Sequence, residues 1–229
     1  MSDVPPIEVP GFLERRPPVD LDAATRAAFD LEFDEAVAAG RAIDAGRGAP
    51  AWQFLAYIVE TRGLLVHGST DPGIDVFEPR QSDDVAAFGN QQAVYAASDA
   101  LWAMYFAILD RDGHPMSLVN AAVRFEGPDG PGDPLYFFSI SEAAHAAGAF
   151  SPGTVYLLPR EPFVQEPPHE FGGRVVHSEQ WASLVPVAPL TRIPVGPEDF
   201  PLLDRIRGHD DEVTTARARA NPDAFPWLD

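Results

Sequence analysis

Three short stretches of this chain carry residue types that suit the binding of a flat aromatic ring. The apolar run 63–66 ends in His67-Gly68-Ser69, and the later run 93–99 contains Tyr95. A helix is expected directly after that run, and it carries three more aromatic residues, Trp102, Tyr105 and Phe106. Aromatic faces stack on flat rings, and a glycine allows a ring to approach the backbone closely. These stretches therefore predict one shared pocket.

The order of these motifs resembles the ADP-ribosyltransferase superfamily, in its His-Tyr-Glu branch. The resemblance implies NAD as a substrate, with His67 contacting a ribose hydroxyl and the Gly68 backbone holding the nicotinamide carboxamide. It further implies that Tyr95 and a second aromatic residue sandwich the nicotinamide. That second residue is Tyr105 or Phe106, since Tyr105 lies ten residues after Tyr95 and the family spacing is one longer. Ser69 belongs to the same cofactor-binding motif.

The third motif of the branch is a late glutamate that aligns the nucleophile, and the resemblance places it at Glu179 in the segment 177–181. Glu170 is the competing carboxylate. Cleavage of the nicotinamide–ribose bond passes through an oxocarbenium-like centre, which a carboxylate stabilises best. The resemblance covers residues 64–200 and extends to uncharacterised bacterial proteins with a His-Gly-Ser start. It implies transfer of ADP-ribose to a protein or small acceptor, or to water.

Arg80 is a candidate for binding the NAD pyrophosphate, because a guanidinium matches phosphate oxygens bidentately. The alternative is a surface ion pair with Asp83 or Asp84. The segment 71–90 is rich in turn-forming and acidic residues, and it is expected to be a loop that lies over the cofactor.

Composition excludes several classes of function. The chain has 229 residues, 45% of them hydrophobic, and a formal net charge of −19. The electric field of so negative a protein repels phosphate backbones, so we expect no nucleic-acid partner. For the same reason, the RNA 2′-phosphotransferase branch of the superfamily fits poorly. The chain contains no lysine. It also contains no cysteine, and this excludes disulfides and thiolate chemistry.

Other catalytic constellations are missing from the sequence. The six histidines show no metal-ligand spacing, so no metal is expected, and no Gly-x-Ser-x-Gly elbow or Gly-rich phosphate loop occurs. The N-terminus lacks the pattern of a signal peptide, and no apolar run reaches the length of a membrane span. A cytoplasmic protein without a membrane partner is the expectation.

The elements that must position these residues can be read from periodicity and caps. A helix is expected from the cap 20–22 to residue 39 with Gly40 ending it, and a second over 51–61 with Gly63 ending it. Both are expected to cover a β core. Two more helices are expected at 99–109 and 141–147, and a solvated acidic helix from residue 210 that Pro222 ends.

Short β-like runs separated by Pro and Gly fill the region after residue 63. The expected strands are 64–67, 93–96, 118–125, 135–140, 154–158, 174–177, 185–187 and 191–195. Unevenly placed helices among short strands favour an α+β fold, and the resemblance specifies a split β-sheet core of the ADP-ribosyltransferase type with two N-terminal covering helices. We expect residues 1–62, the arm and helices, to pack on the domain 63–229 as one compact unit.

A rival interpretation keeps the same fold without catalysis. An acidic protein of this kind could bind a protein partner, as an immunity-like or phage structural component would. The apolar tail 225–227 would then dock on the partner or on the core of its own chain. The direction of Glu179 relative to His67 and Tyr95 discriminates the two interpretations.

Overall fold

The computed structural model describes residues 9–44, 49–82 and 86–228, and shows a mixed α+β protein with two mostly antiparallel sheets. Part of the expected N-terminal arm, and the two aspartates proposed as partners of Arg80, lie outside the described residues. Five α-helices occur in the described part of the chain: α1 Ala23–Ala39, α2 Ala51–Arg62, α3 Ala100–Ala107, α4 Glu142–Ala147 and α5 Asp211–Ala220.

The first sheet, called sheet A, has the order β1-β7-β5-β11-β10, with β6 beside β5 and β14 running parallel to β7. Its strands are β1 Glu14–Arg15, β5 Leu118–Gly127, β6 Gly130–Pro131, β7 Leu135–Ser141, β10 His169–Phe171, β11 Arg174–Ser178 and β14 Arg207–His209.

The second sheet, sheet B, has the order β13-β8-β2-β4-β12-β9, with β3 beside β4. Its strands are β2 Leu65–Ser69, β3 Arg80–Gln81, β4 Gln92–Ala97, β8 Gly153–Leu158, β9 Val164–Gln165, β12 Gln180–Ser183 and β13 Thr191–Val195. The chain crosses between the sheets several times, and between β11 and β12 it passes from sheet A to sheet B through a single residue, Glu179.

The cap and the end of α1 are those that the sequence predicts. The Asp22 side chain accepts a hydrogen bond from Thr25 N at 2.7 Å at the start of α1, and Gly40 ends that helix with φ 60°. Asp99 caps α3 in the same way through Trp102 N. Capping by a short carboxylate satisfies backbone N–H groups that the first turn leaves unpaired, and this explains why these boundaries were predictable.

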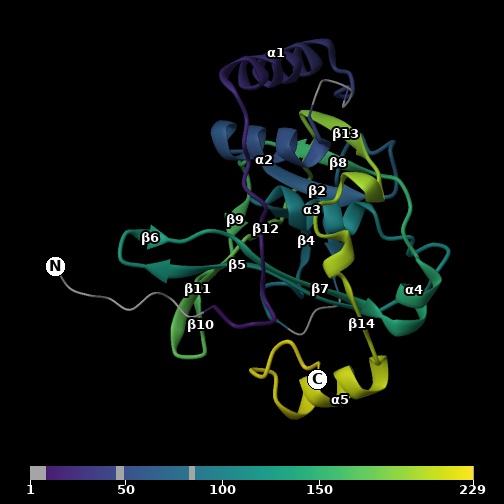
Figure 1. Ribbon diagram of the computed structural model, residues 1–229. Helices are drawn as coiled ribbons and strands as arrows, with labels where there is room; N and C mark the ends of the chain where they lie inside the picture. The colour runs from purple at the N-terminus through teal and green to yellow at the C-terminus, as the bar shows by residue number, and fades with distance from the viewer. Residues whose placement is uncertain (1–8, 45–48, 83–85, 229) are drawn as a thin grey trace.

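One hydrophobic core joins the N-terminal helices to both sheets. Its buried side chains come from α1, α2 and α3, from β2, β7 and β8, and from the segment after β13. In Figure 1, α1 and α2 lie at one end of the molecule and α5 lies at the opposite end. A second buried cluster, built around Leu65, Tyr156 and Trp181, lies on the other face of sheet B.

The expected strand 185–187 is wrong. These residues form no strand, and only Val187 makes an isolated bridge, to Phe77. The strand in this region is β12, which begins five residues earlier and pairs with both β4 and β9. Pairing with β4 and β9 determines which residues form the strand here, and the local preference of residues 185–187 for β structure does not.

The apolar tail docks on its own chain. The Phe225 ring meets Phe137 edge-on with centroids 5.4 Å apart, and it also meets Phe12 and Phe171. Phe225 therefore covers one side of sheet A, and this contact does not need a partner protein.

Candidate active site

Glu179 links the two sheets through its backbone. Its N–H donates to Ala122 O on β5 at 3.0 Å, and its carbonyl accepts from Ser98 N, just after β4, at 2.9 Å. The residue is 5% exposed. Since both backbone groups are bonded to different sheets, the position of the side chain is fixed by the junction of the two sheets.

The Glu179 carboxylate has two partners, one on each side. One oxygen forms an ion pair with Arg124 Nε on β5, and the other accepts a hydrogen bond from Ser98 Oγ. Arg124 also donates to Gly132 O at 3.0 Å, which fixes its guanidinium. A buried carboxylate is stable in such a place only when it is paired and hydrogen-bonded, and Glu179 meets that requirement.

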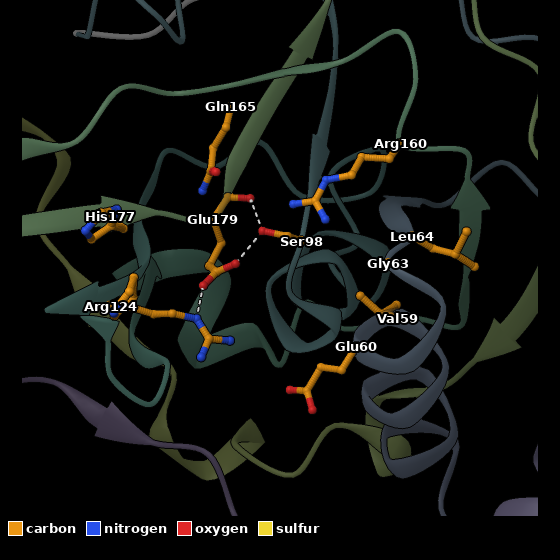
Figure 2. A pocket seen from close by; sticks show the side chains of 11 residues that line it. Val59, Glu60, Gly63, Leu64, Ser98, Arg124, Arg160, Gln165, His177 and Glu179 are labelled. Atoms are coloured by element: carbon orange, nitrogen blue, oxygen red, sulfur yellow. Dashed lines mark hydrogen bonds and ion pairs between the residues drawn. The ribbon is translucent and has the colours of Figure 1, made fainter. Parts of the chain in front are cut away.

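A cavity of about 250 Å³ opens in front of this carboxylate (Figure 2). Its wall is polar and comes from separate elements: the end of α2, the end of β4, β5, β11 and the segment between β8 and β9. Apart from Glu179, the polar side chains of the wall are Glu60, Ser98, Arg124, Arg160, Gln165 and His177.

Trp181 ties the pocket to the neighbouring strand. Its indole Nε1 donates to Ser98 Oγ at 3.0 Å, and the Arg160 guanidinium lies over its ring with the carbon 4.2 Å from the centroid. Ser98 thus accepts from Trp181 while it donates to Glu179. This chain of hydrogen bonds fixes the hydroxyl hydrogen of Ser98, because its one O–H is used toward the carboxylate.

A second buried acid, Asp99, lies next to Ser98. One carboxylate oxygen caps α3 at Trp102 N and the other accepts from the Tyr136 hydroxyl at 2.7 Å. Burial, followed by repulsion from Glu179, raises the pKa of the Asp99 carboxyl to about 6. The hydrogen bonds from Tyr136 and Trp102 oppose this rise but do not cancel it.

The raised pKa of Asp99 gives a pH-dependent stability. Between pH 4 and pH 6 the folded protein holds a proton that the unfolded chain has released, so this contribution is complete below about pH 4 and is lost as pH rises through about 6. We expect Asp99→Asn to remove this loss, and to raise the free energy of unfolding at pH 7 by about 3 kcal/mol. Urea unfolding followed by circular dichroism from pH 4 to 8 measures it.

The control for this prediction is Asp22→Asn, which changes the exposed cap of α1 in the same way. The pKa of Asp22 is lowered by its hydrogen bonds to Thr25, so its contribution changes only in more acidic solution. Histidine contributions are common to wild type and variants, and they cancel in the comparison. Parallel stability curves for Asp99→Asn and wild type between pH 4 and 6 would contradict the prediction.

His67 lies on β2, and the structure defines its tautomer. Its Nδ1 is 2.7 Å from the Tyr95 carbonyl oxygen, which can only accept, so Nδ1 carries the hydrogen and Nε2 is left as an acceptor. Burial lowers the pKa of His67, which keeps the ring neutral at neutral pH. The ring also contacts Phe77, with centroids 4.6 Å apart.

The strand register shows which face of sheet B His67 occupies. Val66 lies opposite Ala97, and Ala97 lies opposite Gln180. Residues opposite one another share a face and neighbours along a strand alternate, so His67 and Trp181 point to the same face. Their strands are two apart, which separates them by roughly 10 Å. His67 therefore lies on the same side of the sheet as Trp181, whose indole is bonded to the Glu179 partner Ser98.

The Tyr95 side chain points to the opposite face of sheet B. The same register places it with Ala97 and Val66 on the side that packs against α3. Its hydroxyl accepts from Gln91 N at 2.8 Å and lies 3.0 Å from Phe88 O, to which it can donate. Tyr95 therefore reaches His67 through its backbone carbonyl, and the two side chains do not meet.

Tyr105 belongs to the core, which corrects the stacking role predicted for it. The ring is fully buried, stacks on Phe138 with centroids 4.6 Å apart, and donates its hydroxyl to Ser139 O at 3.0 Å. Burial raises the pKa of its hydroxyl far above the ordinary value. The alternative residue, Phe106, is half-buried. Its ring meets the Tyr105 ring edge-on and lies tilted against the Trp102 ring.

The other predicted ligand contacts lie outside the Glu179 pocket. Gly68 packs against the backbone of α3, Ser69 accepts from Asp71 N at 3.1 Å, and Arg80 is exposed on β3. Glu170 is exposed on β10 and is not part of the pocket wall. Of the predicted site residues, only Glu179 lines this cavity.

Sequence reasoning missed most of the pocket wall. Ser98 directly precedes the predicted start of a helix, and Arg124 interrupts an apolar strand pattern between Val123 and Phe125. Both are local signals for a side chain with a special partner. Arg160 and Gln165 carry no such signal, because they lie in a turn and a two-residue strand that only the tertiary structure places beside Glu179.

Comparison with models of protein families, with curated proteins and with solved structures finds no match to this chain. Within residues 9–44, 49–82 and 86–228, no three His, Asp or Glu side chains gather in a way that would hold a metal ion. Among the same residues, no helix has the length and hydrophobicity needed to cross a bilayer. Fold and site together define an α+β protein of two sheets with a polar pocket at their junction.

Proposed function

We propose that this protein is an ADP-ribosyltransferase-like enzyme that binds NAD in the junction pocket and cleaves its nicotinamide–ribose bond. The observation that carries the proposal is Glu179, a buried carboxylate that faces a cavity and is oriented by Ser98 and Arg124. It is the one predicted catalytic residue that lines the cavity. The split of the β structure into two sheets joined at this residue supports the same proposal.

The reaction needs a carboxylate at this place. The bond between ribose C1′ and the nicotinamide nitrogen breaks with both electrons passing to nicotinamide, which leaves as a neutral molecule. Positive charge grows on C1′ and the ring oxygen, and Glu179 stabilises it. A hydroxyl group of water or of the acceptor then bonds to C1′, and its proton passes to the Glu179 carboxylate. Arg124 and Ser98 keep the carboxylate in place during these steps.

His67 is proposed as a second contact to the substrate. Its Nε2 is a free acceptor for a ribose hydroxyl, since Nδ1 donates to the Tyr95 carbonyl. The imidazole lies on the same side of sheet B as Trp181, which is hydrogen-bonded to the Glu179 partner Ser98. The Phe77 ring that contacts His67 is part of the segment 71–90, which the sequence predicts to cover the cofactor.

Glu179→Gln is expected to lower the rate of nicotinamide release from NAD by at least about 100-fold, because the amide carries no charge to stabilise C1′. The amide has nearly the same shape, its oxygen can still accept from Arg124, and its NH2 group can donate to Ser98 Oγ, so the fold is retained. Purified protein is incubated with NAD, and released nicotinamide is measured by chromatography. Binding of NAD is measured in parallel by calorimetry.

The matched control is Glu170→Gln, which removes the competing carboxylate on β10, away from the pocket. It should release nicotinamide at the wild-type rate. The proposal fails if wild-type protein binds no NAD at millimolar concentration, or if Glu170→Gln and Glu179→Gln lose activity equally. The first of these results would favour a non-catalytic acidic protein that binds a protein partner.

A further inference from the structure

Arg160 stands at the mouth of the junction pocket in a defined orientation. It follows β8 in a tight turn that is closed by a hydrogen bond from Phe163 N to the Arg160 carbonyl at 2.9 Å. Its guanidinium carbon lies over the Trp181 ring, 4.2 Å from the centroid. Figure 2 shows it pointing toward Ser98 and the middle of the pocket, from the side opposite to Arg124. The residue is exposed, so a ligand can reach it.

The charged groups around the pocket are paired, with Arg160 as the exception. Within the described part of the chain, no carboxylate forms an ion pair with Arg160. The pairs that neutralise the other charged groups are Arg124–Glu179, Arg16–Glu60 and His177–Glu126. Arg124 is further occupied by its bond to Gly132 O. The pocket therefore holds one guanidinium whose donors are available.

An unpaired cation at this pocket matters for ligand choice, because the chain has a net charge of −19. The field of such a protein repels anions at long range, so an anionic ligand needs a local cation that no carboxylate neutralises. A guanidinium offers parallel N–H donors that match two oxygens of a phosphate group. The contact with Trp181 helps to hold the guanidinium in place beside the pocket.

We propose that Arg160 is the anchor for a phosphate group of the substrate. The identity of the substrate rests on the proposed function: in NAD, this group would be the pyrophosphate, held by Arg160 while the nicotinamide ribose lies at Glu179. This replaces Arg80 in the pyrophosphate role predicted from the sequence, since Arg80 lies on β3 and is not part of the pocket wall.

The test measures anion binding separately from catalysis. Inorganic pyrophosphate, ADP-ribose and adenosine are titrated by calorimetry into wild type and Arg160→Gln. We expect Arg160→Gln to weaken pyrophosphate binding about tenfold or more, as for the loss of a charged hydrogen-bond partner, and to leave any adenosine binding unchanged. Arg160→Lys keeps the charge but loses the bidentate geometry, and should bind with intermediate affinity.

The control is Arg205→Gln, which removes the same charge from an exposed arginine outside the pocket wall. It should bind pyrophosphate as wild type does, and both variants should keep the wild-type melting temperature. Equal binding of pyrophosphate by Arg160→Gln and wild type overturns the proposal, as does the absence of pyrophosphate binding in wild type.

The two substrate arms identify where the phosphate comes from. Loss of both ADP-ribose and pyrophosphate binding in Arg160→Gln assigns the phosphate to the nucleotide. Loss of pyrophosphate binding alone assigns it to a phosphorylated second substrate. Either result can occur without release of nicotinamide, so failure of the proposed NAD cleavage and failure of the Arg160 proposal are distinguishable.

Discussion

Gly68→Ala is expected to lower the free energy of unfolding by about 3 kcal/mol or more. An added Cβ would overlap the Ala103 carbonyl oxygen and would lie 2.8 Å from Ala107 N. Both atoms belong to the backbone of α3, so the whole helix must shift to make room, and no flexible side chain can move aside. Urea unfolding followed by circular dichroism measures the loss.

A second glycine, Gly153 on β8, makes the same kind of contact with α3. Its Cβ would lie 2.7 Å from the Ala107 carbonyl carbon and 2.9 Å from Ser69 O. We expect Gly153→Ala to be as damaging as Gly68→Ala, because the two residues lie on adjacent strands under one helix.

Gly132→Ala is the control for both variants. The nearest atom to its added Cβ is Phe125 O at 3.6 Å, an ordinary contact, and we expect a change within about 0.5 kcal/mol. Stability of Gly68→Ala equal to that of Gly132→Ala would show that α3 does not pack as closely on β2 as the structure indicates. Gly68 is thus required for helix packing, in addition to any contact it makes with a ligand.

Tyr105→Ala is expected to lower the free energy of unfolding by about 3 to 5 kcal/mol. The ring is fully buried in the main hydrophobic core and stacks on Phe138. Its removal therefore leaves a cavity that the surrounding strands cannot fill. Tyr105→Phe removes only the hydrogen bond to Ser139 O and should cost about 1 kcal/mol. Both values come from urea unfolding.

The same pair of variants tests whether Tyr105 stacks on nicotinamide. Because the ring has no exposed surface, we expect Tyr105→Phe to bind NAD with the affinity of wild type. Leu184→Ala, at a side chain that is 69% exposed, is the control for stability and should change it little. A small effect of Tyr105→Ala on stability, together with a large loss of NAD affinity, would restore the ligand role that the sequence predicted.

The sequence predicts local structure well where the determining residues are neighbours. The end of α1 at Gly40 and the start of α3 at Asp99 depend on a glycine or a carboxylate within one turn of the helix. The strand 191–195 coincides with β13, because the β-formers Thr191, Ile193 and Val195 alternate along it. The prediction of a strand at 185–187 was wrong, because the residues that form the strand here, β12, are determined by pairing with the distant strand β4.

What the sequence by itself determined is the α+β class, the positions of helices α1 to α4, and the cap and end of α1. With Glu170 as the competitor, it also predicted Glu179 as the carboxylate that could carry chemistry. Only the tertiary structure decided what surrounds that carboxylate. The alternation of strand residues places Tyr95 on the face opposite to His67, and the packing of α3 buries Tyr105. Arg124 and Ser98 contact Glu179, and Arg160 lines the same pocket, because segments of both sheets converge there. No local pattern encodes such a convergence of distant segments.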